Sequence, residues 1–188
     1  TFLNGMVKCT GYKPGALEDR YSSDGVFLYD RLNKSDMEML ELTIRCHNMY
    51  RIPQGLNRRE QAFCNVLRDA DKVDIFKVNI DTPLEEIYNT TTEELMKSDI
   101  TDEVLEAFGE EHCILKAIRR TPADTVIGHV SLAYELVYDE SVRITVEQGY
   151  LGKLMHFHSD NEETNRKMAM VREKMDSHVK KRIGKKDA

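Results

Sequence analysis

Long apolar segments are missing from this sequence. No apolar run approaches the roughly 20 residues needed to span a bilayer, and the longest apolar-rich stretch, residues 126–138, is interrupted by His129 and Glu135. The first residues offer neither a basic segment nor an apolar core, so the sequence predicts no secretion signal. With 40% hydrophobic and 32% charged residues among 188, we expect a soluble globular protein.

Closely spaced cysteines are missing too. The four cysteines, at positions 9, 46, 64 and 113, lack the short spacings of a zinc cluster or a dense disulfide framework. We therefore expect reduced thiols and a cytoplasmic location. The net charge of −6 is unfavourable for nucleic-acid binding, which usually needs a basic contact face. Neither nucleic acid nor a membrane is an expected partner, and the sequence leaves a homodimer open.

Familiar catalytic motifs are also missing. The sequence has no Gly-rich phosphate loop, no dinucleotide fingerprint, no Gly-x-Ser-x-Gly and no His-Glu-x-x-His. What it does have is a repeated helix-start pattern, in which a capping residue is followed three positions later by an acid. The pattern occurs at Ser35–Glu38, Asn57–Glu60, Thr82–Glu85, Thr121–Asp124 and Ser159–Glu162, with Pro83 and Pro122 placed as first helical residues.

These starts predict an all-α fold. The apolar periodicity between them places helices at 23–33, 36–48, 58–76, 83–89, 92–97, 102–108, 112–119, 122–138, 141–148, 150–157 and 160–183. Two apolar stripes are expected to be buried, one formed by Leu40, Ile44 and His47 and the other by Phe63, Leu67 and Ala70.

Residues 68–74 form the first candidate segment for chemistry. Three carboxylates and two cations fall within seven residues, and Asp71 lies four residues after Leu67, at the margin of the expected buried face. A buried carboxylate needs a cation, a metal or several hydrogen-bond donors. Charge pattern alone leaves two interpretations open: a metal ligand, or a helix in which Arg68 and Lys72 neutralise the acids.

Residues 44–48 form the second candidate segment. His47 lies on the apolar stripe, where a single histidine is more often a hydrogen-bonded core residue than a ligand. Cys46 and His47 point about 100° apart on a helix, so they do not form a ready nucleophile–base pair.

Several segments resemble HD-superfamily metal-dependent phosphohydrolases. Residues 66–75, Val-Leu-Arg-Asp-Ala-Asp-Lys-Val-Asp-Ile, are similar to the family's final motif, in which an Asp between a small residue and a Lys or Arg closes the metal site. Residues 44–53 resemble the His-Asn helix end that precedes this motif in a bacterial branch of uncharacterised HD proteins. Residues 98–101, 103–108, 121–124 and 147–151 extend the likeness in the same order, over roughly positions 20 to 175.

The resemblance implies one all-helical HD-like domain over residues 1–188. Residues 1–80 would be the C-terminal half of the HD core, and residues 81–188 a helical extension packed on it. The implied activity is metal-dependent hydrolysis of a phosphate ester, with nucleotides among the candidate substrates. The implied roles are Asp71 as ligand of Mn, Mg or Fe, Lys72 and Arg68 at the substrate phosphate, Asn48 as a substrate contact, His47 as second-metal ligand or general acid, and Asp74 orienting the site from behind.

The sequence departs from the family at its metal-binding residues. It contains no His-Asp pair, its first histidine is at 47, and the family's doublet would fall just before Thr1. Tyr21 stands where a further histidine commonly precedes the equivalent of Gly25. We therefore expect this chain alone to bind metal weakly or not at all. Two alternatives stay open: a degenerate module that binds a nucleotide for regulation, and a helical interaction protein.

Overall fold

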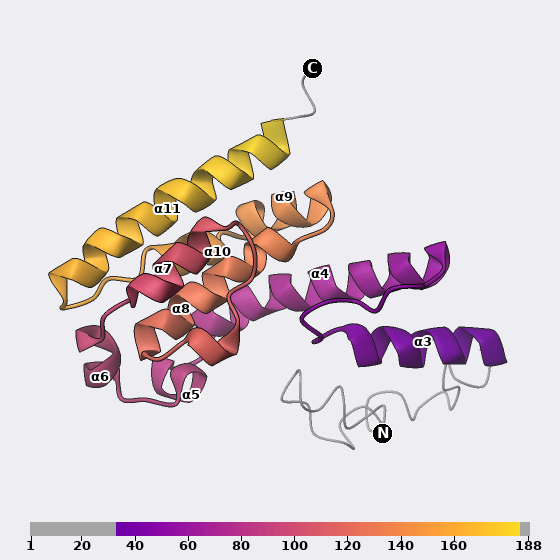
Figure 1. The fold of residues 1–188 in the computed structure, drawn as a ribbon, viewed down its shortest axis with the longest axis horizontal. Helices are drawn as coiled ribbons and strands as arrows, with labels where there is room; N and C mark the ends of the chain where they lie inside the picture. The colour runs from indigo at the N-terminus through magenta and orange to yellow at the C-terminus, as the bar shows by residue number, and fades with distance from the viewer. Residues whose placement is uncertain (1–32, 185–188) are drawn as a thin grey trace, which may run out of the picture. The chain divides into compact units, whose positions relative to one another are not determined.

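The computed structural model describes residues 33–184, which contain nine α-helices, two 3₁₀ turns and no strand (Figure 1). The predicted all-α class is confirmed for this range. Tyr21, Gly25 and all but the last residue of the predicted helix over 23–33 lie outside the described residues. None of the helices described is long and apolar enough to cross a bilayer. The chain divides into two compact units, Thr1–Arg68 and Asp69–Ala188, so each is treated by itself; the prediction of one domain divided near residue 80 stays a prediction.

In the first unit, helix α3 (Lys34–Cys46) precedes helix α4 (Arg58–Asp81), whose residues to Arg68 belong to this unit. The predicted Asn57–Glu60 start is confirmed, because Asn57 Oδ1 accepts from the Glu60 amide at 3.0 Å and Glu60 accepts from the Asn57 amide at 2.9 Å. The predicted Ser35–Glu38 start is wrong. The helix begins two residues earlier than predicted, at Lys34, and the Asn33 side chain caps it by accepting from the Asp36 amide.

The buried face of α3 differs from the predicted stripe. Met39, Thr43 and Cys46 are buried, whereas Leu40, Ile44 and His47 are only half-buried. Thr43 reads as a surface residue, but its hydroxyl donates to the Met39 carbonyl at 2.8 Å, so it can be buried without losing a hydrogen bond.

The predicted stripe of α4 is also wrong, again because polar residues with hydrogen-bond partners are buried. Phe63 is 42% exposed and Ala70 is exposed, whereas Cys64 and Arg68 are buried. The buried face is turned by about one residue, because charged side chains that find partners occupy it.

The second unit holds the rest of α4 and seven further helices: α5 (Leu84–Tyr88), α6 (Thr92–Lys97), α7 (Asp102–Gly109), α8 (Pro122–Val130), α9 (Asp139–Gln148), α10 (Tyr150–Met155) and α11 (Glu162–Ile183). Two predicted helices are shorter than expected, and one of them is reduced to a turn. Residues 112–119 contain only the 3₁₀ turn η2 (Lys116–Ile118), and 122–138 becomes α8 followed by the 3₁₀ turn η3 (Ser131–Glu135).

Ser131 explains both changes. Its hydroxyl donates to the Gly128 carbonyl at 2.7 Å, which competes with continuation of α8. The same oxygen accepts from the Ile114 amide at 3.0 Å, which holds the preceding segment in a non-helical conformation.

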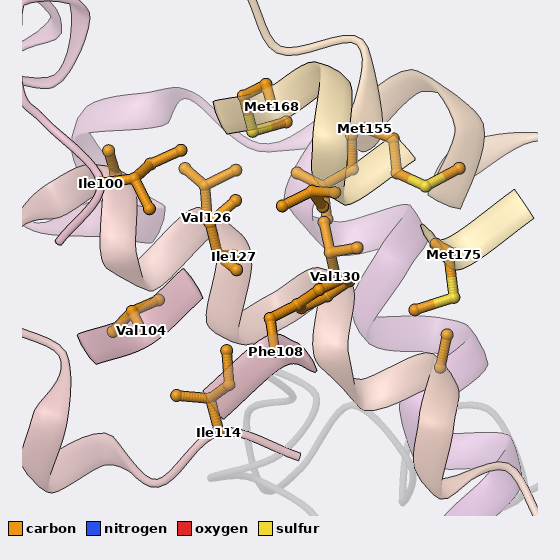
Figure 2. Packing of buried hydrophobic residues seen from close by; sticks show 14 of the residues in the cluster. Ile100, Val104, Phe108, Ile114, Val126, Ile127, Val130, Met155, Met168 and Met175 are labelled. Carbon is orange, nitrogen blue, oxygen red and sulfur yellow. The ribbon is translucent and has the colours of Figure 1, made fainter. Parts of the chain in front are cut away.

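Helix α8 lies in the core of the second unit, where it packs against α7 and α10 (Figure 1). Its side chains Val126, Ile127 and Val130 lie among Phe108 from α7 and methionines from α10 and α11 (Figure 2). Two of the α11 methionines, Met168 and Met175, are 0% exposed.

The start of α8 confirms the predicted Thr121–Asp124 capping box with Pro122 in the first turn. Asp124 is fully buried, and its carboxylate accepts from the amides of Thr101 at 2.8 Å, Arg120 at 2.9 Å and Thr121 at 3.2 Å. One carboxylate therefore fixes both the helix start and the turn before α7.

Two other predicted starts in this unit are wrong. Pro83 is itself the N-cap of α5, so Thr82 caps nothing. Asn161 rather than Ser159 caps α11, and the Ser159 hydroxyl donates to the Met96 carbonyl. The sequence analysis also missed a complete capping box, formed by Thr91 and Glu94 at the start of α6.

Candidate functional site

Arg68 is buried in the first unit and binds the end of α3. Its guanidinium donates to the carbonyls of Cys46 at 3.0 Å, His47 at 3.4 Å and Tyr50 at 3.4 Å, and also to that of Met49. A cation at the carbonyl end of a helix is favourable, because it satisfies unpaired carbonyls and complements the helix dipole. These contacts are structural, and the substrate role stays a prediction.

His47 is half-buried and caps α3. Its Nδ1 lies 2.6 Å from the Ile44 carbonyl oxygen, which can only accept, so Nδ1 carries the proton. In this tautomer Nε2 is the ring nitrogen that a metal ligand or a general base would use, and a general acid would need protons on both nitrogens. Asn48, the predicted substrate contact, is exposed next to it.

Asp69 lies in the charged segment, but the sequence predicts no role for it. It is 2% exposed in the second unit, and its carboxylate accepts from the amides of Val137 at 2.9 Å and Tyr138 at 3.0 Å. These charge-assisted hydrogen bonds anchor the entry to α9. No sequence signal distinguishes Asp69 from its neighbours, since its partners lie nearly seventy positions away.

The predicted site residues of the second unit differ in burial. Asp71 is half-buried, which agrees with its predicted place at the margin of the buried face. Lys72 is 5% exposed, so its charge lies close to the protein interior, and Asp74 is exposed.

A complete metal centre is not formed by the residues that the structure describes. Within residues 33–184 no group of three or more His, Cys, Asp or Glu side chains could hold a metal ion. Asp71 alone would give a metal one protein ligand, and a resident metal needs several. The described residues therefore do not fit a resident metal by themselves.

A second set of polar side chains in this unit, missed by the sequence analysis, lies around η2. We call Lys116, Arg119 and His129 the η2 basic cluster. The Arg119 guanidinium lies flat against Gly128, where the Cβ of any other residue would overlap its Cζ and Nε. Its Nη2 donates to the Ile114 carbonyl, and its buried Nε has no hydrogen-bond partner.

The electrostatics of the η2 basic cluster keep its histidine neutral. Burial, reinforced by the nearby charges of Arg119 and Lys116, lowers the pKa of His129 to about 4. The Tyr88 ring packs against the imidazole, with centroids 5.7 Å apart. Burial also lowers the pKa of Arg119 and raises that of the neighbouring Cys113 thiol.

Comparisons with protein-family models, with curated proteins and with solved structures find no match. The relation to HD phosphohydrolases therefore stays a prediction from the sequence.

Proposed function

We propose that this chain is the part of a cytoplasmic, HD-type, metal-dependent phosphohydrolase that carries the closing Asp motif, and that it acts on a phosphate ester, with nucleotides among the candidates. In this proposal Asp71 donates one carboxylate to a divalent metal, and further ligands come from outside residues 33–184. No disulfide joins the three cysteines that the structure describes, Cys46, Cys64 and Cys113, in keeping with a cytoplasmic location.

The observation that carries the proposal is the fixed setting of Asp71 on α4. In the first unit, the guanidinium of Arg68 is held by backbone carbonyls. In the second unit, the carboxylate of Asp69 is held by two backbone amides. Asp71 follows on the same helix and is half-buried, so the helix fixes its backbone position while solvent still reaches the residue. A metal ligand needs this kind of rigid support, because small displacements weaken coordination.

In this proposal Lys72 attracts the substrate phosphate, and this role does not depend on the metal ligands. A substrate phosphate carries negative charge, and a lysine that is only 5% exposed presents its charge in a poorly hydrated setting, where attraction is stronger. Bound metal would lower the pKa of a coordinated water.

The test compares Asp71→Asn with Asp81→Asn in the complete protein, which must include the further metal ligands that the proposal places outside residues 33–184. Asp81 lies on the same helix and forms only an exposed ion pair with Lys77, so its loss should leave activity unchanged. We expect Asp71→Asn to abolish Mn²⁺-dependent hydrolysis of a panel of phosphate esters, with an unchanged far-UV circular dichroism spectrum.

Two results would contradict the proposal. One is full metal-dependent activity in Asp71→Asn. The other is a complete wild-type protein without metal-dependent phosphatase activity, combined with a lowered melting temperature in Asp71→Asn, because stranding a partner cation destabilises the fold. The second result would favour the helical interaction protein.

A further inference from the structure

We propose that the η2 basic cluster, Lys116, Arg119 and His129, binds the phosphate group of a phosphorylated small molecule. This site does not use Asp71 or a metal, so it stands whether or not the chain hydrolyses phosphate esters.

Arg119 lacks the counter-charge that a half-buried cation requires. It forms no ion pair with any of the residues described, and its one hydrogen bond goes to the neutral Ile114 carbonyl. The adjacent Arg120, by contrast, pairs with Glu103 at 2.7 Å. Withdrawing a cation from water without a partner is unfavourable, and a bound anion would remove the deficit.

Gly128 provides the space that the Arg119 guanidinium occupies. The residue lies in the middle of α8, where glycine is about 1 kcal/mol less favourable than alanine. The helical backbone at this position does not require a glycine. A glycine is required only because a Cβ would overlap Arg119 Cζ and Nε. Glycine at this position therefore lowers the stability of α8 but lets Arg119, which has no ion pair among the described residues, keep one orientation. A fixed guanidinium is suited to bidentate hydrogen bonds with two oxygens of a phosphate.

Two further groups meet at the same place. Lys116 is the first residue of η2 and Arg119 is its C-cap; Lys116 is exposed and forms no ion pair with the residues described. The charges of both reach His129, since both lower its pKa. His129 Nδ1 is buried without a hydrogen-bond partner. Two cations and an unsatisfied imidazole suit a phosphate dianion, in a chain whose net charge is −6.

The nearby groups do not supply the missing negative charge. Burial raises the pKa of the Cys113 thiol, so it stays protonated near neutral pH. Glu135 is negatively charged and acts on Cys113, whose amide it accepts from at 3.2 Å. Among the described residues, however, it forms no ion pair with Arg119 and is not among the charges that shift the pKa of Arg119 or His129. Lys72 adds a further positive charge near Cys113.

The experiment titrates the full chain with inorganic phosphate and, separately, with adenosine monophosphate, following the His129 imidazole signals by NMR. Wild type should show saturable shifts with both ligands, and Arg119→Ala should weaken binding about tenfold or more. Arg120→Ala, the matched control, should stay within about twofold because it loses only an exposed pair. Tighter binding of the nucleotide than of phosphate would assign the site to a nucleotide, and equal binding would assign it to phosphate itself.

Two more variants guard against misfolding of Arg119→Ala. Arg119→Lys keeps the charge but loses the planar fork, and Gly128→Ala displaces the guanidinium without removing it; both should weaken binding. Asp71→Asn should bind phosphate normally, which separates this proposal from the hydrolase. Absence of saturable shifts in wild type, or equal loss in Arg119→Ala and Arg120→Ala, would overturn it.

Discussion

Acidification should destabilise this protein through His129. The pKa of the imidazole is about 4 in the folded chain, against 6.5 for an unperturbed histidine. Below pH 6.5 the unfolded chain therefore takes up a proton that the folded chain does not bind until about pH 4. The stabilising contribution is complete above pH 6.5 and is lost as the pH falls from 6.5 to 4. The difference in pKa corresponds to about 3 kcal/mol of unfolding free energy.

The assay is urea denaturation followed by circular dichroism, in phosphate-free buffers between about pH 4 and 7.5. His129→Phe removes the titrating group and retains an aromatic ring against Tyr88. Acids and other histidines titrate in both proteins, so the difference between the two stability curves isolates His129. We expect that difference to change by about 3 kcal/mol across the range, with wild type losing more stability at low pH. Parallel curves would show that His129 is protonated as readily in the folded chain as in the unfolded one, and would refute the reasoning.

Three substitutions test the buried polar contacts. Asp69→Asn should lower the free energy of unfolding by about 1–3 kcal/mol in urea melts, since it weakens the hydrogen bonds from Val137 and its neighbour. Asp124→Ala should be more severe, about 3 kcal/mol or more in the same assay, because three backbone amides lose a fully buried acceptor. Gly128→Ala should lower the melting temperature despite the better helix propensity of alanine, because its Cβ must displace Arg119; a rise would mean that the guanidinium yields easily.

Local sequence signals predicted the fold where local contacts decide it. The capping boxes at Asn57 and Thr121 are formed by residues three positions apart, and both are present. The hydrogen bond expected for His47 is also present, again to a carbonyl three positions away. The faces of α3 and α4 could not be predicted, because burial of a polar residue such as Asp69 depends on partners far along the chain.

The same limit applies to the candidate sites. The charged segment at residues 68–74 was visible as a cluster of acids and bases, but which of them would be buried was not. The η2 basic cluster gave no signal, because an isolated glycine within a helix and an arginine nine positions before it show no periodic relation.

Oxidation of the methionines of α11 reports how often that helix separates from the core. Met170 is 54% exposed, whereas Met168, two positions earlier, and Met175 are 0% exposed. Peroxide oxidises a thioether where it can reach it, so the exposed side chain reacts in the folded state and the buried pair only when α11 lifts from the core. The ratio of sulfoxide formed at neighbouring positions of one helix therefore measures how often the core of the second unit is exposed to solvent.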